Sequence, residues 1–279
     1  MHLKDNKQQL IALAVAALLL VIIVVVLIAY SARADRPTPT PPDHPDTPTD
    51  PDEPQNPTDP TDPEPPYRYS ADIEAYLAAI GQSYEGLLVN KNVPLGENYI
   101  PDNLVTLDTS DTLYGKSVQL EATAAAALKA MLLCMRADGI RDTYVTSGYR
   151  SYRYQLQLQN RYIGEEMAKN SSLTREQALA IVLTYSAEAG KSEHQSGLCI
   201  DFMTLAMQEL DESFEDTAAF RWLAENACQF GFILRYPKGE EGITGYKYEP
   251  WHYRFVGRDA AVAIQRGGLT LEQYLDAKK

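Results

Sequence analysis

Histidine and cysteine are scarce in this chain, and their scarcity limits the metal and redox chemistry that it can support. The 279 residues contain four histidines and three cysteines. Three cysteines cannot all pair within one chain, and Cys134, Cys199 and Cys228 include no Cys-x-x-Cys pair. Neither a disulfide framework nor a metal site built on paired cysteines is therefore indicated.

Positive charge is also in short supply. The chain carries 25 lysines and arginines against 38 aspartates and glutamates, which gives a formal net charge of −13. Proteins bind nucleic acid largely by neutralising its phosphates, and no basic stripe interrupts this acidic chain. We therefore expect no nucleic-acid partner.

Charge is absent altogether from residues 10–30, which are dominated by Leu, Ile, Val and Ala. A helix of this length, rising about 1.5 Å per residue, can span about 30 Å of hydrocarbon. We expect a transmembrane anchor at 10–30, a short cytoplasmic tail at 1–9, and everything after the span outside the cytoplasm. A cleavable signal peptide is the alternative, because Ala32-Arg33-Ala34 resembles a small-residue cleavage site.

Large apolar side chains are missing from residues 37–66, where thirteen of the 17 prolines lie among Thr, Asp and Glu. Such a tract forms no core and favours extended polyproline II, because proline fixes φ and removes an amide donor. We predict that residues 31–66 are a disordered linker that acts as a stalk. A ligand for a proline-binding domain is the alternative, but the tract lacks the basic residue that usually flanks such ligands.

The remaining residues, 67–279, are numerous enough to bury a core without disulfides. Their helices and strands alternate too unevenly for repeated β-α-β units, so we predict a single compact α+β domain with a mostly antiparallel sheet and flanking helices. Apolar periodicity predicts strands at 87–90, 143–146, 198–203, 232–235, 246–248 and 252–255. It predicts helices at 72–80, 119–138, 152–168, 174–187 and 216–230, two short C-terminal helices, and an irregular arm at 92–107.

Only two histidines, His194 and His252, lie in this domain, and each is close in sequence to a carboxylate. His194 precedes Asp201 by seven residues, with Gly197 between them, and Glu249 precedes His252 by three. Zinc hydrolases use three protein ligands and keep one position for water, and histidine and aspartate are both suitable ligands. These residues offer three ligands and a general base, but spacing alone leaves ordinary hydrogen-bonded histidines equally open.

Three longer motifs make the pattern more specific. They are Thr-Ser-Gly-Tyr-Arg-Ser at 146–151, Ser-x-His-x-x-Gly-x-x-x-Asp at 192–201 and Glu-Pro-Trp-His at 249–252. Together they resemble the VanY-type D-alanyl-D-alanine carboxypeptidases, which are zinc peptidases of peptidoglycan. The resemblance extends over residues 87–258, nearly the whole domain.

The resemblance implies a Zn2+ ion held by His194, Asp201 and His252, with Glu249 as the catalytic base. Arg150 is similar to the residue that stabilises the oxyanion developing at the scissile carbonyl, although a surface salt bridge is the alternative for it. Four further positions are similar to residues that bind the substrate or orient the site, namely Ser151, Gln155, Ser192 and Trp251. For Trp251, a place in the hydrophobic core is an equal alternative.

Cys199 departs from the family pattern, which usually has alanine two residues before the aspartate ligand. Residues two apart on a strand share a face, so its sulfur can approach the metal. We expect Cys199 to pack as a small buried hydrophobe instead, because the His-Asp-His set is already complete and zinc needs its open position.

The activity that the resemblance implies is removal of the terminal D-alanine from peptidoglycan stem peptides. A wall polymer outside the membrane suits the anchor and the stalk, so we expect a single-pass protein of the cell membrane whose partners are these peptides. An L,D-carboxypeptidase or a peptidoglycan endopeptidase would use the same metal set. A catalytically inactive cell-wall-binding module is the alternative from another class, and the intact ligands and base argue against it.

Overall fold

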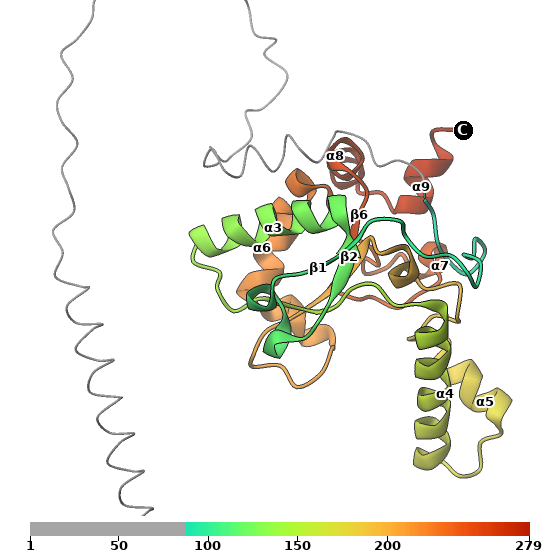
Figure 1. Ribbon diagram of the computed structural model, residues 1–279. Coiled ribbons are helices and arrows are strands. Elements are labelled where there is room, and N and C mark those ends of the chain that lie inside the picture. The colour runs from blue at the N-terminus through green and yellow to red at the C-terminus, as the bar shows by residue number, and fades with distance from the viewer. Residues whose placement is uncertain (1–86) are drawn as a thin grey trace, which may run out of the picture. The chain divides into compact units, whose positions relative to one another are not determined.

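A computed structural model describes residues 87–279, and Figure 1 shows their ribbon. This part of the chain is an α+β domain with antiparallel sheets and flanking helices, as predicted. The expected cytoplasmic tail, membrane anchor, linker and helix at 72–80 lie outside the described residues. Within residues 87–279, no helix combines the length and the apolar character needed to cross a bilayer.

The main sheet contains four strands, and every neighbouring pair is antiparallel. Its two inner strands are β4 (Cys199–Met203) and β6 (His252–Phe255), and all of their residues are buried. Their register puts Asp201 directly opposite His252, so strand pairing alone brings two predicted metal ligands together. In spatial order the strands are β3 (Tyr144–Ser147), β4 (Cys199–Met203), β6 (His252–Phe255) and β5 (Phe232–Leu234).

A smaller antiparallel sheet pairs β1 (Leu104–Thr106) with β2 (Gln119–Glu121), and β2 leads directly into α3 (Ala122–Ala137). The helix predicted at 119–138 therefore begins three residues late, because its first residues pair with β1 instead. Glu121 caps the helix by accepting hydrogen bonds from the amides of Thr123 (2.8 Å) and Ala124 (3.1 Å). Its carboxylate also complements the positive end of the helix dipole.

Two predicted strands are wrong. Residues 87–90 and 246–248 are described by the structure but pair with no strand. Tyr246 and Tyr248 are nevertheless buried, whereas Lys247 between them is exposed. The alternation that suggested a strand is real, but it directs the two tyrosines toward a cavity and not toward a sheet.

The remaining helices flank the sheets. In Figure 1, α4 (Tyr152–Lys169) and α5 (Arg175–Val182) lie side by side, away from α3. The predicted capping box of Thr174 and Gln177 starts α5, but the helix ends five residues before the predicted end at 187. The helix predicted at 216–230 divides into α6 (Ala218–Asn226) and the 3-10 turn η5 (Ala227–Phe230). The other elements are η1 (Thr109–Asp111), η2 (Leu113–Gly115), η3 (Glu193–Ser196), η4 (Glu212–Asp216), α7 (Glu241–Thr244), and the expected C-terminal helices α8 (Arg258–Gly267) and α9 (Leu271–Asp276).

The hydrophobic core packs against one face of the main sheet. Leu128 and Met131 of α3 belong to the same buried cluster as Phe202 of β4 and Phe255 of β6. Burying an apolar side chain of this size stabilises a fold by about 1.5–3 kcal/mol. Successive side chains on a strand point to opposite faces, so Asp201, next to Phe202, points to the face that carries the candidate site.

The predicted arm at 92–107 contacts the turn that carries His194, although its last residues form β1. The Gln195 side chain, which is buried, donates hydrogen bonds to the carbonyls of Gly96 (2.8 Å) and Tyr99 (3.2 Å). The arm therefore holds η3 in place from outside.

Candidate metal centre

Three buried side chains lie close together on the face of β4 and β6 that is turned away from the hydrophobic core. His194 Nε2 lies 3.2 Å from Asp201 Oδ2, and His252 Nδ1 lies 2.8 Å from Asp201 Oδ1. Ligand atoms bound to one tetrahedral zinc at about 2.0–2.1 Å lie about 3.3 Å from one another. Two imidazole nitrogens and a carboxylate oxygen are also a donor set that suits zinc. The chemistry and the spacing of these residues therefore fit the metal that the sequence predicted.

The turn that carries His194 is held from two sides. It is the 3-10 turn η3, which Gly197 ends in a left-handed conformation (φ 69°) that favours glycine. The His194 carbonyl accepts a hydrogen bond from the Arg150 amide (3.0 Å), and its ring Nδ1 lies 2.6 Å from the Gly148 carbonyl. Because a carbonyl only accepts, Nδ1 carries the proton and Nε2 is directed toward Asp201.

Gly148 allows this close approach because it has no Cβ. A Cβ at this position would lie 2.5 Å from the Gln119 carbonyl oxygen and 2.7 Å from the Val118 side chain. The loop after β3 can therefore pack against β2 while its own carbonyl holds His194.

The charges in the cluster are strongly coupled. Burial opposes the ionised form of Asp201, but His194 and His252 outweigh burial and hold the pKa of this carboxyl well below its usual range. Burial and Arg150 lower the pKa of His194, but Asp201 and Cys199 raise it to about 9. Asp201 is therefore an anionic ligand placed between two imidazoles.

Cys199 points to the same place. The ligand atoms of His194, Cys199 and His252 all lie within 4.8 Å of one another, and Cys199 is fully buried. Burial raises the pKa of its thiol, but the two histidines outweigh burial and lower that pKa to about 7. The residue that departs from the family pattern is thus packed against the candidate metal centre.

Glu249 lies beside the centre, close to His252. The His252 amide donates to the Glu249 carbonyl (3.1 Å), which closes a turn over Pro250 and Trp251 before β6. This turn brings Glu249 Oε2 to 3.9 Å from His252 Nδ1. Burial, with a smaller contribution from Asp201, raises the pKa of the Glu249 carboxyl to about 7 against the opposing effect of His252. Such a carboxyl is suited to exchange protons near neutral pH.

A cavity of about 440 Å3 opens over these residues. Arg150 lines it, and the Arg150 Nε is buried without a hydrogen-bond partner among the described residues. The cavity wall also includes Ser192 and Trp251. The sequence did not single out the tyrosines of the wall, which are Tyr162, Tyr185, Tyr236, Tyr246 and Tyr248.

Ser151 and Gln155 are not among the residues that line this cavity. Ser151 is the N-cap of α4 and accepts a hydrogen bond from the Tyr154 amide (3.2 Å). Gln155 is buried and donates to the Ala187 carbonyl (2.7 Å) and the Ser186 hydroxyl (3.4 Å). Both residues fix the start of α4, directly after Arg150.

Sequence reasoning missed two neighbours of His252. The Tyr236 ring stacks on the His252 ring, with centroids 4.9 Å apart. Glu193, next to His194, is buried with one oxygen 3.6 Å from His252 Nε2. A charged residue adjoining a ligand was the available signal, but its partners come from distant strands.

The chain has sequence relatives over most of this domain. Residues 117–258 match the family described as VanY, D-alanyl-D-alanine carboxypeptidase. Over 198 residues the chain is 39% identical to YodJ of Bacillus subtilis, covering 69% of this chain and 67% of YodJ. It is 34% identical over 198 residues to a D-alanyl-D-alanine carboxypeptidase of Enterococcus faecalis, covering 71% of this chain and 68% of that protein.

Solved structures of carboxypeptidases are also similar to this chain in fold and in sequence. The LD-carboxypeptidase LdcB matches this chain with a TM-score of 0.58 and 37% sequence identity, and the match covers 68% of this chain and 84% of LdcB. VanYB in complex with D-alanine-D-alanine matches with a TM-score of 0.58 and 35% identity, and the match covers 69% of this chain and 98% of VanYB. A third match is a variant of VanY from a VanB-type resistance cassette, solved in complex with Zn(II). Its TM-score is 0.57 and its identity 35%, and the match covers 68% of this chain and 97% of that VanY. The chain therefore belongs to the VanY family of D-alanyl-D-alanine carboxypeptidases.

Proposed function

We propose that this chain is a zinc-dependent D,D-carboxypeptidase that removes the terminal D-alanine from peptidoglycan stem peptides. The observation that carries the proposal is the cluster of His194, Asp201 and His252 beside Glu249 in an open cavity. Relatives described as D-alanyl-D-alanine carboxypeptidases, and relatives solved with Zn(II) or with D-alanine-D-alanine, support both the metal and the substrate.

In this mechanism His194, Asp201 and His252 would hold the zinc, which, when bound, would lower the pKa of a water molecule and polarise the carbonyl. Glu249 accepts a proton from the attacking water at its carboxylate and returns it to the leaving amine. The water oxygen forms a bond to the carbonyl carbon that precedes the last residue, and the bond from this carbon to nitrogen breaks. The products are D-alanine and a peptide shortened by one residue.

Arg150 stabilises the negative charge that develops on the scissile carbonyl oxygen. Its guanidinium lines the cavity, and its Nε has no hydrogen-bond partner among residues 87–279, so a donor is available without displacing a described protein partner. Ser192 and Trp251 contact the substrate from the cavity wall. Ser151 and Gln155 act indirectly, by holding the backbone around Arg150.

An L,D-carboxypeptidase is the second candidate, because LdcB is as similar in fold to this chain as VanYB is. The two activities differ in the peptide that is accepted. Pentapeptides that end in D-alanyl-D-alanine and the corresponding tetrapeptides should be incubated with the full-length chain, with and without a chelator. We expect D-alanine release from the pentapeptide, abolished by the chelator. Faster release from the tetrapeptide would assign the L,D activity instead.

We also propose that residues 10–30 anchor the chain in the cell membrane, with residues 1–9 in the cytoplasm and residues 67–279 outside it. The uncharged run at 10–30 and the proline-rich spacer at 31–66 support this arrangement, which suits a wall substrate outside the membrane. Protease added to intact cells with a permeable wall should digest the C-terminal domain. Protection of that domain would contradict the proposed orientation.

A further inference from the structure

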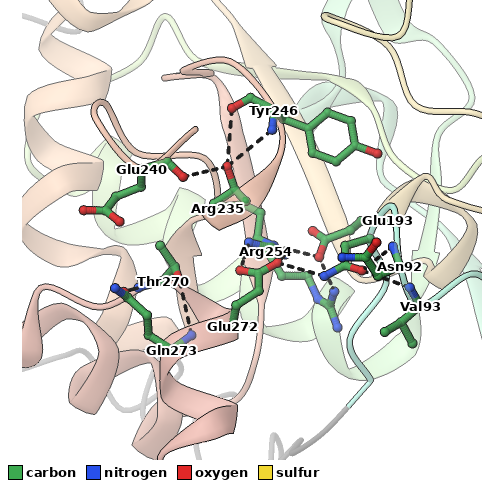
Figure 2. Close-up of polar contacts among 12 residues, drawn as sticks. Asn92, Val93, Glu193, Arg235, Glu240, Tyr246, Arg254, Thr270, Glu272 and Gln273 are labelled. Atoms are coloured by element: carbon green, nitrogen blue, oxygen red, sulfur yellow. Dashed lines mark hydrogen bonds and ion pairs between the residues drawn. The ribbon is translucent and has the colours of Figure 1, made fainter. Parts of the chain in front are cut away.

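A buried ionic cluster lies behind the candidate metal centre. It consists of Glu193, Arg235, Arg254 and Glu272, and Figure 2 shows the contacts that join them. Arg235 and Glu193 are 0% and 1% exposed, and Arg254 is 2% exposed. Charges at such depth are costly unless each is paired and hydrogen-bonded, so their arrangement has to satisfy strict geometric limits.

The two arginines hold one oxygen of Glu193. Arg235 Nε donates to Glu193 Oε1 (2.7 Å), and Arg254 Nη1 donates to the same oxygen (2.9 Å). Both guanidinium groups are themselves fixed. Arg235 makes a bidentate pair with Glu272 (2.8 and 2.6 Å), and Arg254 Nε donates to the Phe255 carbonyl (3.0 Å). Glu193 therefore cannot rotate without breaking charge-assisted hydrogen bonds.

The other oxygen of Glu193 faces His252. Glu193 Oε2 and His252 Nε2 are both buried and both lack a hydrogen-bond partner among the described residues. They lie 3.6 Å apart. Buried polar atoms are nearly always hydrogen-bonded, so two unpaired atoms that face each other indicate a contact that forms when the site is complete.

The properties of imidazole identify the contact between Glu193 Oε2 and His252 Nε2 as a hydrogen bond. His252 presents Nδ1 to Asp201 (2.8 Å), on the side where the metal is proposed to bind. A neutral imidazole that binds a metal through Nδ1 carries its proton on Nε2, and metal-binding histidines usually donate that proton to a carboxylate or carbonyl.

We propose that Glu193 is a positioning residue for His252, whose Nε2 proton it accepts so that Nδ1 stays directed at the metal. This inference rests on the proposed zinc site. The cluster explains why the carboxylate is available for this task, since the arginines neutralise it while occupying only its Oε1. Tyr236 stacks on the His252 ring and restricts its tilt, so Glu193 needs only to fix the rotation within the ring plane.

The variant Glu193→Gln tests the proposal. The arginines require an acceptor, so the glutamine would turn its carbonyl to them and its NH2 group to His252, where a second donor repels the Nε2 proton. We expect zinc affinity of the full-length chain, measured by competition with a chelator, to fall about 10–100-fold. Glu272→Gln is the matched control, because it weakens the same Arg235 without facing His252; its zinc affinity should fall much less than that of Glu193→Gln, since Arg254 still holds Glu193.

Thermal melts of the metal-free proteins separate positioning from stability. Both variants should lose stability, because each leaves Arg235 with a weaker partner. If Glu193→Gln lost stability as Glu272→Gln does but kept the wild-type zinc affinity, Glu193 would be a structural residue only and the proposal would be overturned.

A measurement on the wild type does not depend on whether the variants fold. In the zinc-loaded full-length chain with 15N-labelled histidine, NMR should show a slowly exchanging Nε2 proton on His252 and a metal-bound Nδ1. Metal bound through Nε2, or an Nε2 proton in fast exchange with water, would overturn the proposal. Neither readout needs turnover. An intact Nε2 proton in a zinc-loaded chain that releases no D-alanine would therefore contradict the proposed function alone.

Discussion

At the scale of single residues, two carboxyls beside the same histidines, those of Asp201 and Glu249, have opposite shifts in pKa. Burial disfavours the ionised form of both. At Asp201 the two histidines outweigh burial and hold the pKa well below its usual range, whereas at Glu249 burial dominates and raises the pKa to about 7. A difference of this kind separates a permanently anionic group, suited to bind a cation, from one suited to carry a proton. The environments thus support Asp201 as ligand and Glu249 as base.

Replacing Glu249 by glutamine should therefore remove turnover without removing the metal. Loss of a general acid-base group typically lowers a rate by about 10²–10⁴-fold, and the three ligands are untouched. D-alanine release and zinc content per chain should be measured together. Glu225→Gln, an exposed residue of α6 outside the cavity, is the control and should behave as the wild type. Unchanged D-alanine release by Glu249→Gln would refute the assignment of the base.

Replacing Cys199 by alanine tests whether its thiol binds the metal. The sulfur lies near both histidines, but Asp201 already contacts both rings and completes a set of three ligands. We expect Cys199→Ala to retain one zinc per chain with an affinity close to that of the wild type. A variant that bound no zinc, or a charge-transfer band from thiolate to cobalt in the cobalt-substituted wild type, would identify Cys199 as a ligand.

At the scale of elements, the site depends on strand register and on one tight loop. The pairing of β4 with β6 sets Asp201 opposite His252, and a slip of one residue would turn one of them into the core. The loop after β3 supplies the carbonyl that orients His194, and it can do so because Gly148 packs against Gln119 without a side chain.

The variant Gly148→Ala should consequently weaken both the fold and the metal site. Its Cβ would lie 2.5 Å from a backbone oxygen, so the loop must move. Overpacking of this kind costs about 1–3 kcal/mol, which urea denaturation would measure, and zinc affinity should fall because the Gly148 carbonyl is displaced. Gly164→Ala is the control, since nothing lies within 4 Å of that position in α4 and stability should rise by about 0.4–1 kcal/mol. Equal stability and zinc affinity in Gly148→Ala and the wild type would contradict this reading.

At the scale of the whole molecule, the metal would join η3, β4 and β6, which are already supported by the core and the buried ionic cluster. Chelation should therefore lower the melting temperature while leaving the helix content unchanged. A ligand that binds only the folded state stabilises it by about 2.7 kcal/mol at a free concentration of 100 times Kd. Circular dichroism melts at several free zinc concentrations measure this. A melting temperature independent of zinc would contradict it, as would loss of secondary structure on chelation.

The features that could be predicted from the sequence are those that depend on residues close together in the chain. The capping box at Thr174, the core strands and the ligand motifs each lie within a few residues, and each is present in the structure. Prediction failed where distant pairing decides the outcome. Residues 119–121 became a strand because β1 pairs with them, and residues 246–248 did not, because their tyrosines line a cavity.

The buried ionic cluster shows the same limit in the site. Arg235 and Arg254 contact Glu193 across separations of 42 and 61 residues, and no spacing rule connects them. Each is a charged residue beside apolar strand positions, which is unusual, but only the folded sheet shows which carboxylate they neutralise.

The most direct test of the zinc-dependent reaction is to restore zinc to the metal-free full-length chain and follow D-alanine release from a pentapeptide that ends in D-alanyl-D-alanine. If His194, Asp201 and His252 hold one catalytic zinc, release should start from zero, rise in proportion to added zinc and reach its plateau at one ion per chain. D-alanine release that persists without metal, or that remains absent after one zinc per chain has bound, would contradict the proposed function.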